Sequence, residues 1–244
     1  MRPVHIIVSC EHAGNLIPNA YKHLFSGEEE ILTTHKGWDP GALTIAKKIA
    51  DYTQSRLFST KVSRLLIDCN RSIDNSELFS VHSKVVHDSV KKALLDHYYL
   101  PYRKKVEDYI AVNIIERPVV HLSIHTFTPI WHGSERLVDV GLLFDDNRQL
   151  ESQFCESWRA MASKYVPEIL VMLNVPYHGA DDGFTTYLRS KFTENRYLGI
   201  EIEINQKWIH TQELQGIVMG LYKALEESLN NYSITKFTSN ENFS

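Results

Sequence analysis

Short apolar runs alternate along this chain with segments of helical periodicity, and this alternation constrains the fold more than any other feature. Runs rich in Val, Ile and Leu predict buried strands, whereas apolar residues spaced three and four apart predict amphipathic helices. Strands are expected at residues 4–9, 62–68, 119–124, 138–144, 169–173 and 197–204, and helices at 42–53, 85–112 (kinked at Pro101), 150–165 and 211–229. The pattern indicates an α/β fold of three layers, with a central, mostly parallel or mixed β-sheet and helices on both faces.

Length and composition fit one globular domain. The chain has 244 residues, of which 43% are hydrophobic and 23% charged, which is enough apolar material for a sizeable core. We expect residues 1–230 to form a single catalytic α/β domain. Residues 231–244, rich in Asn, Ser and Thr, are expected to form a polar C-terminal tail.

Charge and cysteine content indicate a cytoplasmic protein. The formal net charge of −4 supplies no basic surplus for nucleic acid or an anionic membrane. Three cysteines without a close pair argue against a disulfide framework. The N-terminal apolar run, broken by His5 and Ser9, is too short for a signal peptide, and no stretch approaches the roughly 20 apolar residues that span a bilayer.

Polar clusters follow the predicted strands. They are Ser9-Cys10-Glu11-His12, then Asp68-Cys69-Asn70-Arg71-Ser72, then His125-Thr126, then Asn174 with Tyr177 and His178, and finally Glu201, Glu203 and Asn205. Strand ends are often polar simply because loops are. However, ligands bind at the carboxyl ends of parallel strands, so several such clusters together favour a site at one rim of the sheet.

Histidines at two strand ends suggest a metal. A catalytic zinc takes three protein ligands from His, Asp and Glu, and it lowers the pKa of a bound water. His12 and His125 are the best imidazole candidates because each follows a strand. Asp39, just before a predicted helix, is either a third ligand or an ordinary N-cap, and its spacing does not separate the two.

Acidic and basic side chains supply candidates for the remaining roles. Glu201 and Glu203 share one face of their strand, and Glu203 lies nearer its carboxyl end. Arg71 and Arg189 are candidates for binding a substrate carboxylate, because a guanidinium matches its geometry. The chain contains no G-x-S-x-G, H-E-x-x-H, Walker or G-x-G-x-x-G motif, which argues against the commonest serine hydrolases, zincins, NTPases and dinucleotide enzymes.

A series of blocks resembles the N-formylglutamate amidohydrolase family from about Val4 to Gln206. In order, they are SCEHAGNLIP, HKGWDPGA, DCNRS, LSIHTFTP, RLVDVGLLFD, NVPYHGADDGFTTYLR and GIEIEINQ. The resemblance implies a phosphorylase/hydrolase-like fold, related to zinc carboxypeptidases and zinc cell-wall amidases. One block departs from the family, because this chain has Glu11-His12-Ala13-Gly14 where a Pro-His-Ser-Gly type of loop is usual, which suggests a different acyl group.

The resemblance also implies roles for individual residues. It makes His12, Asp39 and His125 ligands of Zn²⁺ or another divalent metal, with Glu203, or alternatively Glu201, as the catalytic carboxylate. It makes Arg71 the residue that binds the substrate carboxylate, and it places the remaining substrate contacts at Asn70, Asn174, Tyr177 and Arg189.

The expected function is metal-dependent hydrolysis of the amide of a small N-acyl amino acid such as N-formylglutamate. Water activated by the metal would attack, with a Glu as general base. Two alternatives stay open: a zinc amidase or carboxypeptidase acting on peptide or peptidoglycan fragments, and a non-catalytic relative that binds a metal or small molecule. The expected partner is the small-molecule substrate alone, without nucleic acid or membrane.

Overall fold

A computed structural model describes residues 4–235 and has a six-stranded sheet at its centre. The strand order is β2-β1-β3-β8-β6-β7. The strands are β1 (His5–Cys10), β2 (Arg56–Ser59), β3 (Val119–Phe127), β6 (Val140–Leu143), β7 (Val171–Leu173) and β8 (Tyr197–Asn205). Strands β2, β1, β3 and β8 run parallel, whereas β6 and β7 run in the opposite direction.

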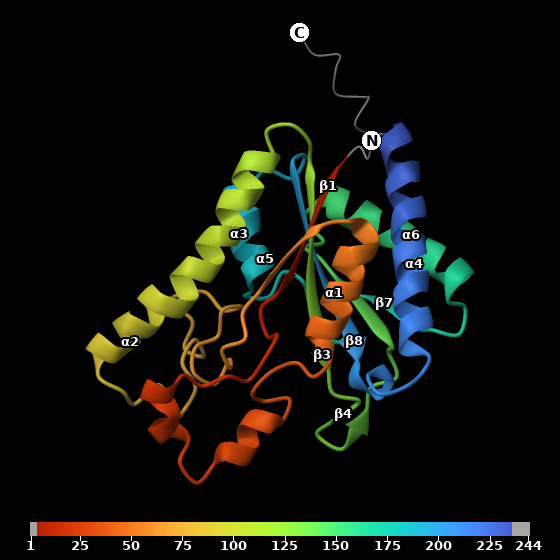
Figure 1. Ribbon diagram of the computed structural model, residues 1–244. Coiled ribbons are helices and arrows are strands. Elements are labelled where there is room, and N and C mark those ends of the chain that lie inside the picture. Colours follow the sequence, from red (N-terminus) through yellow and green to blue (C-terminus); the bar gives the residue numbers. More distant parts are fainter. Residues whose placement is uncertain (1–3, 236–244) are drawn as a thin grey trace.

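Helices cover both faces of this sheet, which confirms the expected three-layer α/β architecture (Figure 1). One face packs against α1 (Ala42–Thr53), α4 (Gln149–Tyr165) and α6 (Leu214–Thr235). The other packs against α3 (Leu100–Asn113) and α5 (Phe184–Lys191). Alternation along β1 supplies both cores, because Ile6 and Val8 point to the first and Ile7 to the second.

The predicted helices are present with small shifts in their ends. The long helical segment consists of α2 (Asp88–Leu94), a π-helical turn (Leu95–Tyr99) and α3, in which Pro101 is the second residue. Helix α6 continues to Thr235, five residues into the predicted tail, and residues 236–244 lie outside the described part.

Within residues 4–235, no helix has the length and hydropathy to cross a membrane. The three cysteines, Cys10, Cys69 and Cys155, are free thiols.

The prediction of a strand at residues 62–68 is wrong. This segment is a loop that makes only an isolated bridge from Val62 to Leu16, and the edge strand is β2 instead. Polar side chains satisfy its backbone locally: Ser63 Oγ accepts from the N–H of Leu65, and Asp68 Oδ1 accepts from the N–H of Asn70. Such local bonds compete with strand pairing, so the apolar residues reach the core without a strand.

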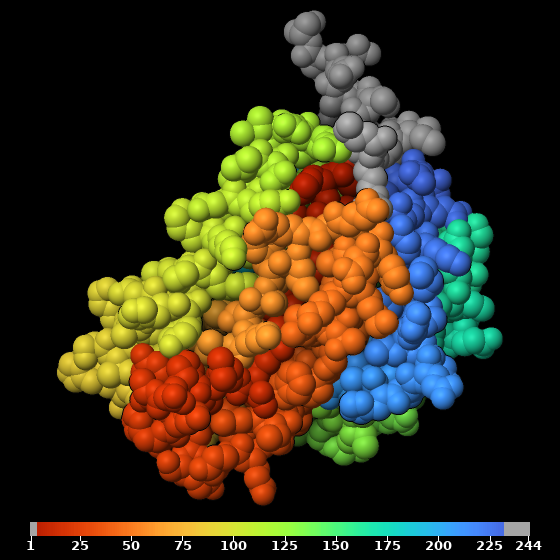
Figure 2. Space-filling model, viewed as in Figure 1, coloured from red at the N-terminus to blue at the C-terminus, as the bar shows by residue number. Residues whose placement is uncertain are grey.

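Loops gather at the carboxyl edge of the four parallel strands. Two 3₁₀ segments, Asn19–Phe25 and Glu29–Thr33, lie there against the 60–84 loop and the α2 region, and they occupy the lower left of the molecule (Figure 2). Phe25 packs on His82 with ring centroids 4.9 Å apart. A small hairpin of β4 (Ile130–Trp131) and β5 (Ser134–Glu135) follows β3 at the same edge.

Candidate metal centre and adjoining cavity

His12, Asp39 and His125 converge at this edge of the sheet. His12 follows β1, Asp39 precedes α1, and His125 lies near the carboxyl end of β3, next to β1. The backbone N–H of Asp39 donates to the carbonyl oxygen of His12 (3.0 Å), which holds the two loops together. One potential ligand atom from each side chain lies within 4.8 Å of the others, and all three residues are buried.

The two imidazoles present the same nitrogen to Asp39. Asp39 Oδ2 lies 2.9 Å from Nδ1 of His125 and 3.4 Å from Nδ1 of His12. The other ring nitrogens face away: Nε2 of His12 lies 2.7 Å from Asp68 Oδ1, and Nε2 of His125 lies 3.0 Å from Ser123 Oγ. A proton on Nε2, hydrogen-bonded to these partners, turns Nδ1 toward the centre, which is the orientation that a metal-binding histidine requires.

Buried polar groups extend this arrangement behind His125. Ser123 donates to Glu11 (2.6 Å), and the hydroxyl of Tyr102 donates to the other oxygen of the same carboxylate (2.7 Å). Burial raises the pKa of Glu11, but the neighbouring His125 and Ser123 outweigh it, so its pKa lies well below the usual range. Glu11 is therefore an ionised carboxylate behind His125.

The donor set fits a divalent cation. Nδ1 of His12 is buried and has no hydrogen-bond partner, which is costly unless a ligand fills the position. Burial, and next the charge of Arg64, lower the pKa of His12 to about 4, so its Nδ1 lone pair is available at neutral pH. Burial lowers the pKa of His125, but the hydrogen bond to Glu11 and the charges of Glu203, Glu201 and Glu11 outweigh it and raise that pKa to about 9, so this ring releases a proton when it binds a metal. Two imidazoles and one carboxylate, each with a polar partner behind it, form a typical site for zinc or a similar ion.

Asp39 is not the N-cap of α1. Gly41 occupies that position, and the Asp39 side chain makes no capping bond. Its carboxylate contacts the two histidines on one side and the guanidinium of Arg64 on the other. The structure thus excludes the N-cap interpretation and places the Asp39 carboxylate with the two histidines.

Glu203 and Glu201 lie on β8, beside β3, but in different environments. Glu203 pairs in register with His125, is 7% exposed, and has one buried oxygen without a hydrogen-bond partner. Burial raises its pKa to about 7, and the charge of Glu201 adds to this. Glu201 instead accepts a hydrogen bond from Thr185 (2.5 Å).

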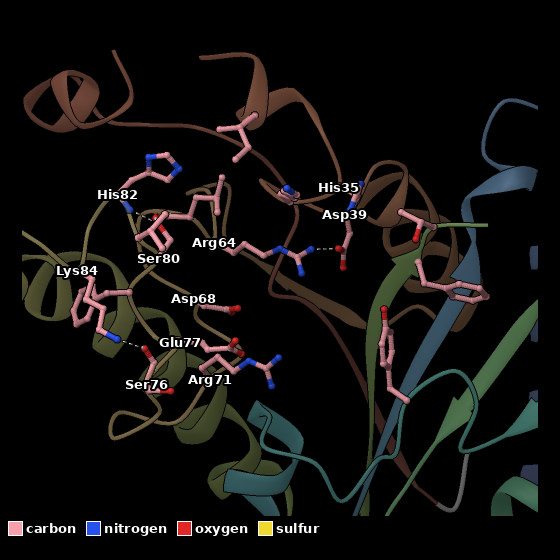
Figure 3. Close-up of a pocket in the computed structure, with 18 of the residues that line it drawn as sticks. His35, Asp39, Arg64, Asp68, Arg71, Ser76, Glu77, Ser80, His82 and Lys84 are labelled. Carbon is pink, nitrogen blue, oxygen red and sulfur yellow. Dashed lines mark hydrogen bonds and ion pairs between the residues drawn. The ribbon is translucent and has the colours of Figure 1, made fainter. Parts of the chain in front are cut away.

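A cavity of about 750 Å³ opens beside the cluster, and Asp39 and Asp68 form part of its lining. Figure 3 shows Arg64 directed at Asp39, with Arg71 also at the cavity. One terminal nitrogen of Arg71 donates to the carbonyl oxygen of Asp182 (2.7 Å). Tyr177 lines the cavity too, whereas the side chain of Asn70 caps α5 by accepting from the N–H of Phe184 (2.8 Å).

Besides Asn70, two further residues predicted as substrate contacts have structural partners within the protein. Arg189 is buried against Glu151 and donates to the carbonyl oxygens of Gly179 and Gly199. Asn174 follows β7, whose carboxyl end faces away from the rim because β7 runs opposite to β8. Its side chain accepts from the N–H groups of Phe144 and Gly179 and so shapes the return of the chain toward Tyr177.

Sequence reasoning missed three residues of this region. Arg64, which contacts Asp39, lay inside the segment mistaken for a strand. Asp68 and Glu11 stood in polar clusters without an assigned role, and Glu11 was also noted as a departure from the family's loop. The usable signal was that Glu11 directly precedes a candidate ligand, since carboxylates commonly orient metal-binding histidines.

Comparison with known proteins places this geometry in a family. The sequence model described as N-formylglutamate amidohydrolase matches residues 4–210. The crystal structure of gene product Atu2144 from Agrobacterium tumefaciens superposes with a TM-score of 0.80, at 28% identity over 94% of this chain and 92% of that one.

A second solved structure has the same fold at lower identity. The N-formylglutamate amidohydrolase from Ralstonia eutropha JMP134 has a TM-score of 0.65, at 15% identity over 97% of this chain and 95% of that one. No curated protein sequence matches this chain. Because the family match spans most of the described sheet together with His12, Asp39, His125 and Glu203, the chain belongs to the N-formylglutamate amidohydrolase family.

Proposed function

We propose that the protein is a metal-dependent amidohydrolase that cleaves the amide bond of a small N-acyl amino acid, with N-formylglutamate as the reference compound. The observation that carries this proposal is the convergence of two Nδ1 atoms and one carboxylate beside a cavity. Family membership supports the reaction class, an amide hydrolysis.

His12, Asp39 and His125 would hold the metal. A divalent ion bound there supplies a Lewis acid that polarises a carbonyl oxygen and lowers the pKa of water. Zn²⁺ is the ion we favour, because two imidazoles and one carboxylate make a common zinc ligand set. Asp68 orients His12, and Ser123 orients His125, so that both Nδ1 atoms point toward the position where an ion would be held.

Glu203 would move the proton. A general base works best with a pKa near the working pH, and burial brings the pKa of Glu203 to about 7. Its unpartnered oxygen is free to accept a proton from water and to donate it to the leaving amine. Glu201 is the less suitable carboxylate because Thr185 already occupies one of its oxygens.

Arg71 would bind the carboxylate of the amino acid. Its guanidinium is half-buried at the cavity, and Asp182 uses only one of its terminal nitrogens. A guanidinium binds a carboxylate through paired hydrogen bonds, which fixes orientation as well as position. Tyr177 lines the same cavity and offers a hydroxyl group that also contacts Arg136 (3.2 Å).

The decisive experiment combines metal content with turnover. Protein stripped by a chelator and reloaded with Zn²⁺ should hydrolyse members of a panel of N-acyl amino acids that includes N-formylglutamate. Glu203→Gln should bind the metal and lose about 10²- to 10⁴-fold in kcat, as expected when a general base is removed. Glu201→Gln is the matched control on the same strand face and should retain most of the activity.

Other results would contradict the proposal in specific ways. An inactive Glu201→Gln variant together with an active Glu203→Gln variant would assign the role of general base to Glu201 and not to Glu203. Stoichiometric metal without turnover of any N-acyl amino acid would favour the non-catalytic alternative, and turnover of peptides alone would favour the peptidase alternative.

A further inference from the structure

The cavity beside the candidate metal centre is large for a formyl amino acid. Its volume of about 750 Å³ lies in the upper part of the range in which pockets enclose drug-sized ligands. N-formylglutamate is far smaller than such ligands. N-formylglutamate would therefore leave much of the cavity unfilled.

The lining is divided into a polar part and apolar parts. The side chains nearest the metal centre are charged, and we call them the polar floor: Asp39, Arg64, Asp68 and Arg71. Ile31, Phe79 and Val81 bring apolar groups from the 3₁₀ segment and the 60–84 loop, where polar side chains such as Ser80 and His82 lie between them. Three aromatic rings also line the cavity, and we call them the aromatic wall: Phe127 of β3, Trp131 of β4, and Tyr177 from the loop that follows β7.

Several of these apolar groups are exposed in the free protein. The exposed fractions are 78% for Val81, 46% for Trp131 and 41% for Tyr177. Apolar side chains gathered in this way around a pocket indicate a surface that a ligand covers. Trp131 is notable because its two-residue strand β4 contributes nothing to the core.

The aromatic wall is held in place from within the protein. The guanidinium of Arg136 lies 5.0 Å from the Trp131 ring centroid, 5.1 Å from that of Tyr177 and 5.5 Å from that of Phe127. The same group donates a hydrogen bond to the hydroxyl of Tyr177 (3.2 Å). Cation–π contacts of this kind fix the rings before a ligand arrives, which lowers the entropy cost of binding.

We propose that the substrate is an amphipathic N-acyl amino acid that carries an apolar group of several carbons or a ring. Its carboxylate and amide lie on the polar floor, and its apolar group covers the aromatic wall. This inference rests on the proposed function for the reaction itself. Neither a formyl group nor a glutamate side chain would displace water from these apolar surfaces.

Two series of compounds test the proposal with the zinc-loaded enzyme. The first extends the acyl group of glutamate from formyl through acetyl and butanoyl to hexanoyl. The second keeps the formyl group and changes the amino acid from glutamate to norleucine and phenylalanine. In at least one series kcat/KM should rise with apolar size, by about fourfold per added methylene group, the factor expected for ordinary apolar burial.

Two neighbouring substitutions assign the effect to the aromatic wall. Trp131→Ala should abolish most of the increase with apolar size, and Trp131→Phe should keep part of it. Ile130→Ala is the matched control, because Ile130 is the other residue of β4, is 62% exposed, and is not among the residues that line the cavity. It should leave both series unchanged.

Binding measurements separate this inference from the proposed function. Calorimetry with zinc-loaded Glu203→Gln should give tighter binding of N-hexanoylglutamate, or of the formyl derivatives of norleucine and phenylalanine, than of N-formylglutamate, with the preference lost in Trp131→Ala. If that preference appears but the wild-type protein cleaves none of the compounds, the proposed function fails and this inference stands. If N-formylglutamate is cleaved and bound at least as well as every larger compound, the inference is wrong and the proposed function stands.

Discussion

The hydroxyl of Ser123 lies 2.6 Å from the carboxylate of Glu11, and both groups are buried between β1 and β3. Ser123 uses its only proton in this bond. Toward His125, whose Nε2 lies 3.0 Å away, the Ser123 oxygen can therefore only accept, and Nε2 must carry the proton. The pair therefore keeps a proton on Nε2 of His125, so that Nδ1, which lies 2.9 Å from Asp39 Oδ2, is the nitrogen that can release its proton and bind a cation.

Replacing Ser123 with Ala should weaken metal binding. Loss of such an orienting partner usually lowers metal affinity by about 10- to 100-fold, and we expect a decrease of that size in competition with a chromophoric chelator. Ser9→Ala is the matched control, since Ser9 pairs in register with Ser123 but contacts His121 (2.7 Å) instead. An equal loss in both variants would show that general packing, and not the tautomer, sets the affinity.

The buried carboxyl of Glu203 should make the stability of the metal-free protein depend on pH. Burial raises its pKa from 4.5 to about 7, so the folded protein holds this proton more tightly than the unfolded chain does. The contribution to stability is complete below pH 4.5 and is lost as pH rises through 7. Glu203→Gln removes this dependence, so above pH 7 it should be more stable than the wild type by about 3 kcal/mol, since one pKa unit corresponds to about 1.4 kcal/mol.

Urea unfolding in the presence of a chelator at pH 5 and pH 8 measures this difference. The two proteins should have nearly equal unfolding free energies at pH 5 and should diverge at pH 8. Glu201→Gln keeps Glu203 in place and should retain the decrease with pH. Added Zn²⁺ should reduce the gap at pH 8, because a nearby cation favours the ionised carboxylate. A constant difference between wild type and Glu203→Gln at both pH values would contradict the assignment.

The sequence predicted those parts of the site that depend on neighbouring parallel strands. β1 and β3 are adjacent and parallel, so the polar residues at their carboxyl ends meet, and this brings His12 to His125. The direction of a strand is not encoded in an apolar run. Asn174 was therefore predicted at the rim, although β7 runs the other way and carries it elsewhere.

Loop residues were harder to predict because their positions depend on tertiary contacts. The Ser63 hydroxyl donates to the carbonyl oxygen of Gly37 (2.8 Å), and the N–H of Arg64 donates to the same oxygen (3.2 Å). These contacts join segments far apart in the sequence and bring Arg64 to Asp39. No periodicity records such a contact, whereas helix α1 was located correctly from its apolar spacing and the Asp39-Pro40 signal before it.

Arg189 and Arg71 should differ sharply when each is replaced by Ala, although the sequence assigned both to substrate binding. Arg189 is 8% exposed and pairs with Glu151, which is fully buried. Its removal leaves that carboxylate with Arg148 and two backbone N–H donors, and two carbonyl oxygens lose their donor. Breaking a buried ion pair from one side costs about 3–5 kcal/mol, so Arg189→Ala should lose about that much unfolding free energy.

Arg71→Ala should instead act on the substrate, because this side chain is only half-buried and faces the cavity. We expect less than about 1 kcal/mol change in unfolding free energy and at least a tenfold rise in KM, since a hydrogen bond to a charged group contributes about 1.5–3 kcal/mol. Urea unfolding and steady-state kinetics on both variants check this contrast. A folded, stable Arg189→Ala protein with a raised KM would return Arg189 to the substrate site, because a purely structural residue would change stability first.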